Sequence, residues 1–562
     1  MSDAVPRRHV LKVLAGIGIG STVFYRALAA EVEKAGQVTP EMIKQAEWIA
    51  GLELSDEERE STARAVDRAA RDFRAMRDVE IGYDVMPAIL FNAAPTKRQS
   101  TEPPKRAVSM IEAAAPKRPA SKEDLAFLPV TELAALMRAR RVSSIELTKL
   151  YLERLKRYDD ALHCVVTLTE DLALEQAKKI DREIAAGRYR GSLHGIPWGA
   201  KDLIAYPGYG TGWGAAPFKD QMLDVKATVA QRLEEAGAVL VAKLALGALA
   251  MGDKWYGGMT RNPWNPKEGS SGSSAGSASA TAAGLVGFSL GSETLGSIIS
   301  PSRRCGTSGL RPTFGRVSRY GCMSLAWSMD KIGPICRSVE DCALVLAAIH
   351  GHDGFDPTAV DQPFQWPPKR DLRQMTIGFF ATDGAPEKRS EIKVLEKLGA
   401  KLVRLKLPDR YPVWALTMIL NAECAAVFDP LTRNSVTEGI GRWANTFRQG
   451  QFIPAVEYLR ANRIRTLLMQ EMEAMLAGVD AYVGGNDLSI TNLTGHPTVV
   501  LPNGFKKRGG AEVPTSITFT GKLFGETDLL TIANAYQRET GFHLRHPTLK
   551  NLSAFDDKSD KG

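Results

Sequence analysis

Apolar residues recur along most of this chain at the spacings of helices and of strands, in alternation. Residues 143–162 follow the helical spacing, and residues 227–246 follow it first and then become an apolar run. Short apolar runs typical of buried strands occupy 195–204, 376–380, 400–407 and 498–505. The alternation predicts an α/β fold, with helices on both faces of a largely parallel or mixed central sheet.

Near the N-terminus, the pattern predicts a short helix over residues 38–54. Thr39 can cap its first turn, and Pro40 suits a position in that turn. Gly51 can end the helix, because glycine readily adopts the left-handed conformation found after a last helical turn.

A longer helix is predicted over residues 54–79. Ser55 and Glu58 have the spacing of a capping box, in which each side chain bonds the backbone N–H of the other residue. The helix carries a narrow apolar stripe of Val66, Phe73 and Met76. Two helices bury little surface alone, so this stripe needs a partner surface.

The first thirty residues differ from the rest of the chain. Arg7 and Arg8 precede an apolar, glycine-rich run over 13–30, which is too short to span a bilayer. The run ends in the small-residue pattern Ala27-Leu28-Ala29. We expect a twin-arginine export signal and therefore a periplasmic or secreted protein. An amphipathic N-terminal helix is the alternative.

Composition narrows the classes of protein that fit. The 562 residues carry a formal net charge of only +8, with both signs mixed along the chain, which argues against nucleic-acid binding. No later stretch reaches the ~18 apolar residues of a membrane span, so we expect no stable membrane anchor after signal cleavage. The six cysteines form no CxxC pair and indicate no disulfide framework.

These features divide the chain into segments. Residues 86–122 are rich in Pro, Ala, Lys and Arg without periodicity, as in an extended linker. We assign a signal peptide (1–30), a helical segment (31–85), a linker (86–125), a main α/β domain (126–552) and a polar tail (553–562).

The stretch EGSSGSSAGSASATAAGLVGFSLGSETLGSIISPSRRCG, at 268–306, is unusually rich in glycine and serine. Helix formers and a strand-like segment follow directly, which a flexible linker would lack. Such runs inside a fold let backbone N–H groups converge on an anion or on a developing negative charge. No Gly-Lys-Ser/Thr ends the run, so it does not match a phosphate-binding P-loop.

Other motifs compete with this interpretation. Residues 272–276 and 287–291 both fit the G-x-S-x-G pattern of an α/β-hydrolase nucleophile, with His496 as a candidate histidine. Chance matches are easy in a glycine-serine run, so we give this interpretation little weight. We interpret two further pairs as a surface coincidence and a turn, namely Ser390 with Lys393 and His350 with His352.

Several separated segments together resemble the amidase signature family. They are GIPWGAKDLI, GSSAGSASATAAGLV, GSETLGSIISPSRRCGTSGLRPTFGRVSRYG and SMDKIGPICRSVEDCALVL, in the family's order and spacing. The resemblance covers roughly residues 126–550. It implies an α/β/α sandwich around a mixed, twisted sheet, and cleavage of carboxylic amides by a Ser–cis-Ser–Lys triad.

The resemblance also implies roles for individual residues. Lys201, in GAKD, corresponds to the base, and Ser297, in TLGS, corresponds to the nucleophile. The serine run offers two registers for the bridging cis-serine; we choose Ser273 over Ser270, because that alignment keeps the following AAGLV in step without a gap. The implied oxyanion hole consists of the backbone N–H groups of Thr294, Leu295, Gly296 and Ser297.

The implied chemistry needs an uncharged lysine. A buried, neutral Lys201 would accept a proton through Ser273 while Ser297 attacks the amide carbon. The proton would pass to the leaving amine, and water would hydrolyse the acyl-enzyme. The resemblance implies no metal and no organic cofactor. We expect a small-molecule amide as substrate, and a homodimer is left open.

The sequence departs from the family pattern beside this site. Leu295 stands where glycine is common, Ile299 stands where arginine is common, and residues 243–253 lack the usual polar asparagine and glutamate. These changes favour a bulky or apolar acyl group.

A second, shorter resemblance links residues 38–92 to the C subunit of tRNA-dependent amidotransferases, which wraps around an amidase-signature A subunit. It implies that both are fused here, and that the apolar stripe packs on the main domain. The alternatives left open are an A-subunit-like component of such an amidotransferase, an esterase or carbamate hydrolase on the same fold, and an inactive binding protein.

Overall fold

The computed structural model describes residues 37–81, 88–89, 116–380 and 389–549. The predicted export signal and polar tail lie outside the described residues, as does most of the predicted linker. The described residues fall into two compact units. One combines residues up to 89 with 409–437 and 442–467, and the other contains the remainder.

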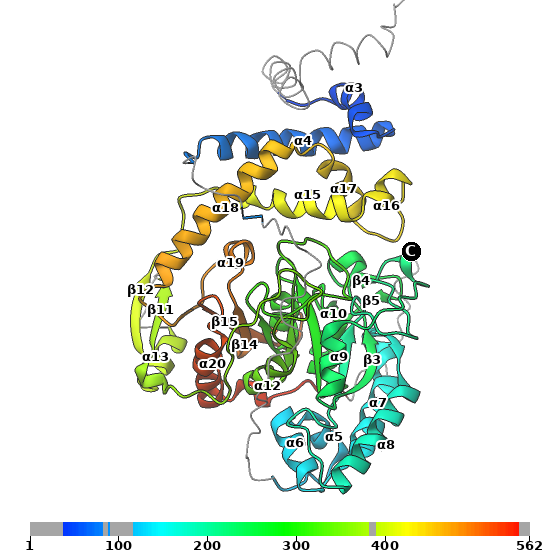
Figure 1. Ribbon diagram of the computed structural model, residues 1–562, viewed down its shortest axis with the longest axis vertical. Helices are drawn as coiled ribbons and strands as arrows, with labels where there is room; N and C mark the ends of the chain where they lie inside the picture. The colour runs from blue at the N-terminus through cyan, green and yellow to red at the C-terminus, as the bar shows by residue number, and fades with distance from the viewer. Residues whose placement is uncertain (1–36, 82–87, 90–115, 381–388, 550–562) are drawn as a thin grey trace, which may run out of the picture. The chain divides into compact units, whose positions relative to one another are not determined.

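A mixed sheet forms the centre of the larger unit (Figure 1). Eleven strands of the described chain form it, in the order β1-β3-β2-β8-β10-β9-β14-β15-β13-β11-β12. They are β1 (Val165–Leu168), β3 (Val239–Leu244), β2 (Pro197–Lys201), β8 (Phe288–Glu293), β10 (Lys331–Cys336), β9 (Ser308–Arg311), β14 (Thr498–Arg508), β15 (Ala511–Gly521), β13 (Ala481–Val483), β11 (Thr376–Phe380) and β12 (Lys401–Leu405). β2 runs parallel to β3 and β8, whereas β8, β10, β9, β14 and β15 follow one another antiparallel.

Helices cover this sheet, which confirms the predicted α/β class. Those that pack on its strands include α7 (Ser144–Leu162), α8 (Glu170–Ala185), α10 (Ala275–Ala282), α12 (Val339–Ile349) and α20 (Glu526–Thr540). Every residue of β2, β3, β8 and β10 is buried. Because side chains alternate between the two faces of a strand, this burial means that both faces are covered. Among the described helices, we find none whose length and hydropathy would let it span a bilayer.

The smaller unit contains both predicted N-terminal helices. α3 (Pro40–Ala50) begins at the cap Thr39 and ends at Gly51 in the left-handed conformation, as predicted. α4 (Asp56–Arg77) begins with the predicted capping box: Glu58 Oε2 accepts from the Ser55 N–H at 2.8 Å, and Ser55 Oγ accepts from the Glu58 N–H at 3.3 Å.

The apolar stripe of α4 is buried, at Val66, Phe73 and Met76. Within the same unit, α4 contacts α14 (Val413–Leu416) and α17 (Trp443–Gly450). Val66 and Ile43 belong to a hydrophobic cluster that also contains Phe452. The N-terminal helices therefore share a core with residues from the segment 409–467, which the sequence had placed inside the main domain.

This shared core predicts a selective effect of Phe452→Ala. Removing a buried phenylalanine ring costs about 3 kcal/mol or more of folding free energy. We expect faster amide hydrogen exchange over α3 and α4 in this variant, measured by mass spectrometry on the full chain. Leu459→Ala, at a side chain that is 46% exposed in the same unit, is the matched control and leaves exchange there unchanged. Equal exchange in both variants would show that Phe452 does not hold these helices.

Candidate active site

The glycine-serine run of 268–306 is continuous structure. It passes through a loop into α10, then into β8, and through a second loop into α11 (Ile299–Cys305). The two loops lie side by side, because the Ser274 N–H donates to the Ser297 carbonyl at 3.1 Å. Residues far apart along the run are thus brought to one place at the end of the buried strand β8.

Lys201 is the last residue of β2, and its side chain extends to the point where the two loops meet. Its amine Nζ lies 2.8 Å from Ser273 Oγ and 3.1 Å from Ser274 Oγ. It also lies 2.8 Å from Ser292 Oγ and 3.3 Å from the Ser292 carbonyl. Lys201 is fully buried, and the contacts of its amine are serine oxygens rather than a carboxylate.

The structure distinguishes between the two serine registers by position. Ser273 contacts the Lys201 amine, and the peptide bond between Gly272 and Ser273 is cis. Ser270 instead donates its hydroxyl to the Ser271 carbonyl at 2.9 Å. Ser297 is also buried, with its backbone held beside Ser274. The three predicted triad residues therefore lie in one neighbourhood.

Burial governs the protonation of Lys201. Loss of hydration lowers the pKa of its amine to about 7, and the more distant charges of Asp330 and Glu293 only partly oppose this shift. The pKa of an ordinary lysine is 10.5, so a much larger fraction of this amine is neutral near pH 7. A neutral lysine amine can accept a proton, which a charged one cannot.

An adjacent ion pair helps to hold β2 in place. Asp202 follows Lys201 and pairs with Lys243 of β3 at 2.8 Å, with both side chains fully buried. Lys243 also donates to the Gly210 carbonyl and to Thr211 Oγ1, each at 3.0 Å. Lys243 was not among the residues predicted for the site, although a charged residue inside the apolar strand run VLVAKLAL is a detectable signal.

Two glycines allow the loops to approach so closely. A side chain at Gly272 would place its Cβ 1.8 Å from the Gly252 carbonyl oxygen, so only glycine fits there. Gly296 has φ of 91°, a backbone conformation that residues with a Cβ rarely adopt. These two positions explain why glycine flanks both candidate catalytic serines.

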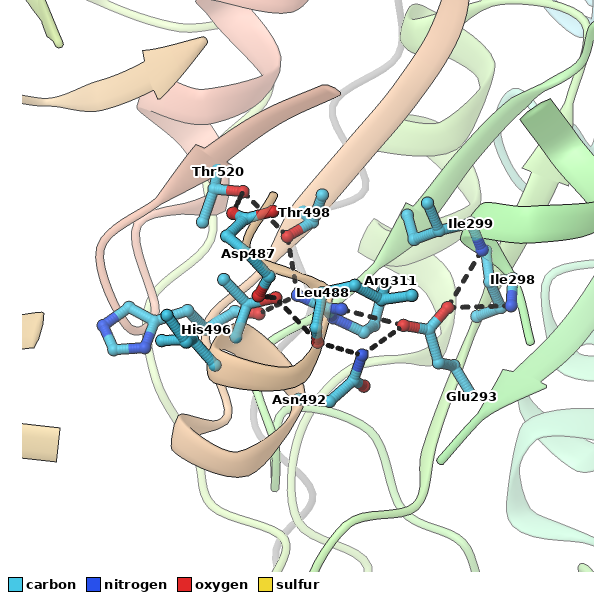
Figure 2. A network of polar contacts seen from close by, with 12 residues as sticks. Glu293, Ile298, Ile299, Arg311, Asp487, Leu488, Asn492, His496, Thr498 and Thr520 are labelled. Carbon is cyan, nitrogen blue, oxygen red and sulfur yellow. Dashed lines mark hydrogen bonds and ion pairs between the residues drawn. The ribbon is translucent and has the colours of Figure 1, made fainter. Parts of the chain in front are cut away.

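The second loop is held by the buried carboxylate of Glu293 (Figure 2). Its Oε2 accepts from the N–H groups of Ile298 and Ile299 at 2.8 and 2.9 Å. Its Oε1 accepts from Arg311 Nη1 and Asn492 Nδ2, both at 2.8 Å. One side chain thus closes the loop that carries Ser297 and satisfies the first N–H groups of α11.

The charge of Glu293 is stabilised in place. Burial alone would raise the pKa of its carboxyl, but the Arg311 charge and the Ile299 N–H lower it to about 2. Arg311 is itself anchored, donating to the His496 carbonyl at 2.9 Å and to Thr498 Oγ1 at 2.6 Å. Glu293 was recognised from the sequence only as part of a motif, with no role predicted for its side chain.

The loop between Glu293 and α11 contains the predicted oxyanion-hole residues. Thr294 is fixed by its hydroxyl, which donates to Asp330 Oδ1 at 2.6 Å. Within the described part of the chain, no group accepts a hydrogen bond from the backbone N–H groups of 294–297. The four N–H groups of the predicted oxyanion hole are therefore without an acceptor among the described residues. Leu295, one of the noted departures, is partly exposed, and Ile299 is buried.

The competing motifs do not form sites of their own: Ser274, the serine of the 272–276 match, contacts Lys201 Nζ and donates to the Ser292 carbonyl, each at 3.1 Å. Ser289 lies inside β8, where its hydroxyl donates to the Ser277 carbonyl at 3.0 Å. His496 Nδ1 contacts Thr494 Oγ1 at 2.8 Å, and burial lowers the pKa of its imidazole to about 4. Ser390 Oγ donates to a carboxylate oxygen of Glu391 at 3.4 Å, and no hydrogen bond joins it to Lys393 in the described chain.

Comparisons with known proteins agree on one family. Residues 146–485 match the family model described as Amidase. The A subunit of the glutamyl-tRNA(Gln) amidotransferase of Moorella thermoacetica is 33% identical over 488 residues, covering 76% of this chain and 99% of that protein. The A subunit of the same enzyme from Chloroflexus aurantiacus is 34% identical over 488 residues, with the same coverage of 76% and 99%.

Comparison with solved structures indicates the same family. The native peptide amidase of Stenotrophomonas maltophilia superposes with a TM-score of 0.66 at 29% identity, covering 75% of this chain and 98% of that one. A bacterial aryl acylamidase shares the fold, with a TM-score of 0.64 at 21% identity and coverage of 76% and 99%. The chain therefore belongs to the amidase signature family, a family of amide-cleaving enzymes.

The Glu293 network predicts the effect of Glu293→Gln. The variant leaves the Arg311 guanidinium buried without its countercharge, which costs about 3–5 kcal/mol of folding free energy. We expect a lower urea midpoint at pH 7 and a loss of activity in the folded protein, because the Ser297 loop is no longer closed.

The same substitution has a defined pH dependence. The pKa of Glu293 is lowered to about 2 from a usual 4.5, so its stabilising contribution is complete above pH 4.5 and is lost as the pH falls towards 2. The difference in unfolding free energy between the wild type and Glu293→Gln should therefore shrink over that range. A constant difference would contradict a role for the ionised carboxylate.

Proposed function

We propose that this protein is a serine amidase in which Lys201, Ser273 and Ser297 form the catalytic triad. The observation that carries the proposal is the Lys201 amine, which is fully buried among serine oxygens and lies 2.8 Å from Ser273 Oγ. Family membership supports the amide-cleaving reaction. The lowered pKa of Lys201 supports its role as the base.

The proposed reaction begins with proton transfer. Neutral Lys201 accepts the proton of Ser273, and Ser273 in turn accepts that of Ser297. Ser297 Oγ then forms a bond to the amide carbon, and the negative charge that develops on the carbonyl oxygen is stabilised by the N–H groups of 294–297. The proton returns through Ser273 to the amine nitrogen, the C–N bond breaks, and an acyl-enzyme remains.

Water completes the cycle. The same relay removes a proton from water as the water attacks the acyl carbon, and Ser297 leaves with that proton. The products are a carboxylic acid and an amine, and the enzyme returns to its starting state. We propose linear, small-molecule amides as the substrate class. The acyl chemistry also allows esters or carbamates, which makes the ratio of amide to ester turnover the direct test of this class.

A second candidate is the A-subunit-like role in a tRNA-dependent amidotransferase. The similarity to the A subunits of Moorella thermoacetica and Chloroflexus aurantiacus favours it. The resemblance of residues 38–92 to the C subunit of such enzymes stays a prediction. Glutamine hydrolysis that requires a tRNA-binding partner would support this candidate, whereas hydrolysis of simple amides by the chain alone supports the amidase.

We also propose that the protein is exported by the twin-arginine route, on the strength of Arg7, Arg8 and the apolar run that follows them. Replacing both arginines by lysine should keep the protein in the cytoplasm, as judged by fractionation of the producing bacterium. Unchanged export would refute this route.

The two serine registers give a matched pair of variants. Ser297→Ala removes the proposed nucleophile, and Ser273→Ala interrupts the relay; each should lower kcat by about 10³-fold or more. Ser270→Ala, in the alternative register, should retain most of the activity. A fluorophosphonate probe should label the wild type but not Ser297→Ala. Labelling that persists in this variant would place the nucleophile elsewhere.

The proposed base predicts the pH profile of the enzyme. Because neutral Lys201 is the active form and its pKa is lowered to about 7, kcat/KM should rise with pH through an apparent pKa near 7 and then level off. Lys201→Met should abolish the activity and the step together. A profile that is flat from pH 5 to 9 would be incompatible with Lys201 as the base.

A further inference from the structure

A basic cavity adjoins the first loop of the candidate active site and helix α11, which follows the second loop. It has a volume of about 530 Å³ and is lined by residues of α11, β14 and β15 and by Ser271. Four cationic side chains face it: Arg303 and Arg304 from α11, and Lys506 and Arg508 from β14. The mechanism described above uses none of them.

The charges around this cavity are unbalanced. Glu268 of β7 (Asn265–Gly269) pairs with Arg304 at 3.1 Å, and it also accepts from Arg508 Nε at 3.0 Å. The side chains of Arg303 and Lys506 are exposed and make no ion pair or hydrogen bond with another residue of the described chain. Glu268 does not itself line the cavity, and it pairs with only two of the four cations that do.

A second carboxylate, Asp253, lies near the cavity without lining it. Its Oδ2 accepts from the Ser271 N–H at 2.8 Å. Counting both carboxylates, the excess of positive charge remains. A concave surface with one dominant sign of charge attracts ligands of the opposite sign.

Two of the cavity's lining residues lie close in sequence to the candidate catalytic serines. Ser271 precedes Ser273 by two positions on the first loop. Ser300 follows Ser297 by three positions, and its N–H donates to the Gly296 carbonyl at 2.7 Å. A Cβ built at Gly296 would stand 3.1 Å from Ser300 Oγ, so this part of the cavity wall packs against the loop that carries Ser297.

We propose that the cavity is a substrate subsite that binds a carboxylate carried by the amide. The inference rests on the proposed function and specifies its substrate class: linear amides with a negatively charged group a few bonds from the scissile C–N bond. The guanidinium of Arg303 matches a carboxylate in two parallel hydrogen bonds, and Lys506 adds a mobile positive charge. The carboxylate belongs either to the leaving amine or to the acyl group.

Matched pairs of substrates test whether the carboxylate belongs to the leaving amine or to the acyl group. For the amine side, N-benzoylglycine is compared with N-propylbenzamide, which lacks the carboxylate. For the acyl side, succinic acid mono-para-nitroanilide is compared with pentanoyl para-nitroanilide. We expect kcat/KM to be about tenfold higher for the charged member of one pair, a preference that weakens as salt is raised.

The double variant Arg303→Gln/Lys506→Gln tests the residues. It should lower kcat/KM for the preferred charged substrate about tenfold more than for its neutral partner. Lys507→Gln is the matched control, because Lys507 is an exposed neighbour in β14 that does not line the cavity, and it should preserve the ratio. Circular dichroism spectra that match the wild type exclude misfolding as the cause.

Binding distinguishes failure of this inference from failure of the proposed function. Binding can be measured without turnover, by calorimetric titration of each charged substrate and its neutral partner into Ser297→Ala protein. Tighter binding of the charged member, lost when Arg303 and Lys506 are replaced, supports the subsite even if no amide is cleaved. Equal binding of charged and neutral members overturns the subsite, while hydrolysis of the neutral amides would leave the amidase assignment intact.

Discussion

The site depends on a buried lysine amine that, among the residues the structure describes, has no carboxylate within contact distance. Its nearest partners are the Ser273, Ser274 and Ser292 oxygens, which accept hydrogen bonds but supply no countercharge. Two other buried cations of the same unit do have a carboxylate partner: Lys243 pairs with Asp202, and Arg311 pairs with Glu293. Burial without a partner makes the charged form costly and thereby makes the neutral form available. This difference in pairing separates a base from structural cations of the same type.

The paired cations explain why the unpaired one can be tolerated. Asp202 is bonded to Lys243 on the neighbouring strand, so the end of β2 is fixed directly after Lys201. Glu293 gathers N–H groups of α11 together with Arg311 and Asn492, so the loop that carries Ser297 is closed from the opposite side. Stability is therefore supplied by residues next to the reactive groups rather than by those groups themselves. Such a division is common where a functional group is held in an unfavourable state.

Local signals in the sequence were sufficient for much of this architecture. The caps at Thr39 and Ser55 follow from short-range hydrogen bonding, and the strand ending in Lys201 follows from an apolar run. The choice of Ser273 over Ser270 came from an alignment argument, and the structure places Ser273 at the Lys201 amine. The partners of Glu293 were not accessible, because Asn492 lies 199 positions away and no periodicity links the two residues. The pairing of the N-terminal helices with residues 409–467 was hidden for the same reason.

The smaller unit is built from segments that lie far apart in the sequence, and this affects how the chain folds during synthesis. Its N-terminal helices leave the ribosome before the rest of the unit, and Phe452, which completes their hydrophobic cluster, is synthesised nearly four hundred residues later. Until then, the apolar side of α4 lacks part of its native cover, and exposed apolar surface of this kind promotes association with other chains. Contacts between segments so distant in sequence also form slowly, since a long loop must close first. We therefore expect α3 and α4 to be among the last elements of the unit to reach their final packing. A chaperone that holds the nascent chain would protect their apolar surface until Phe452 has been synthesised.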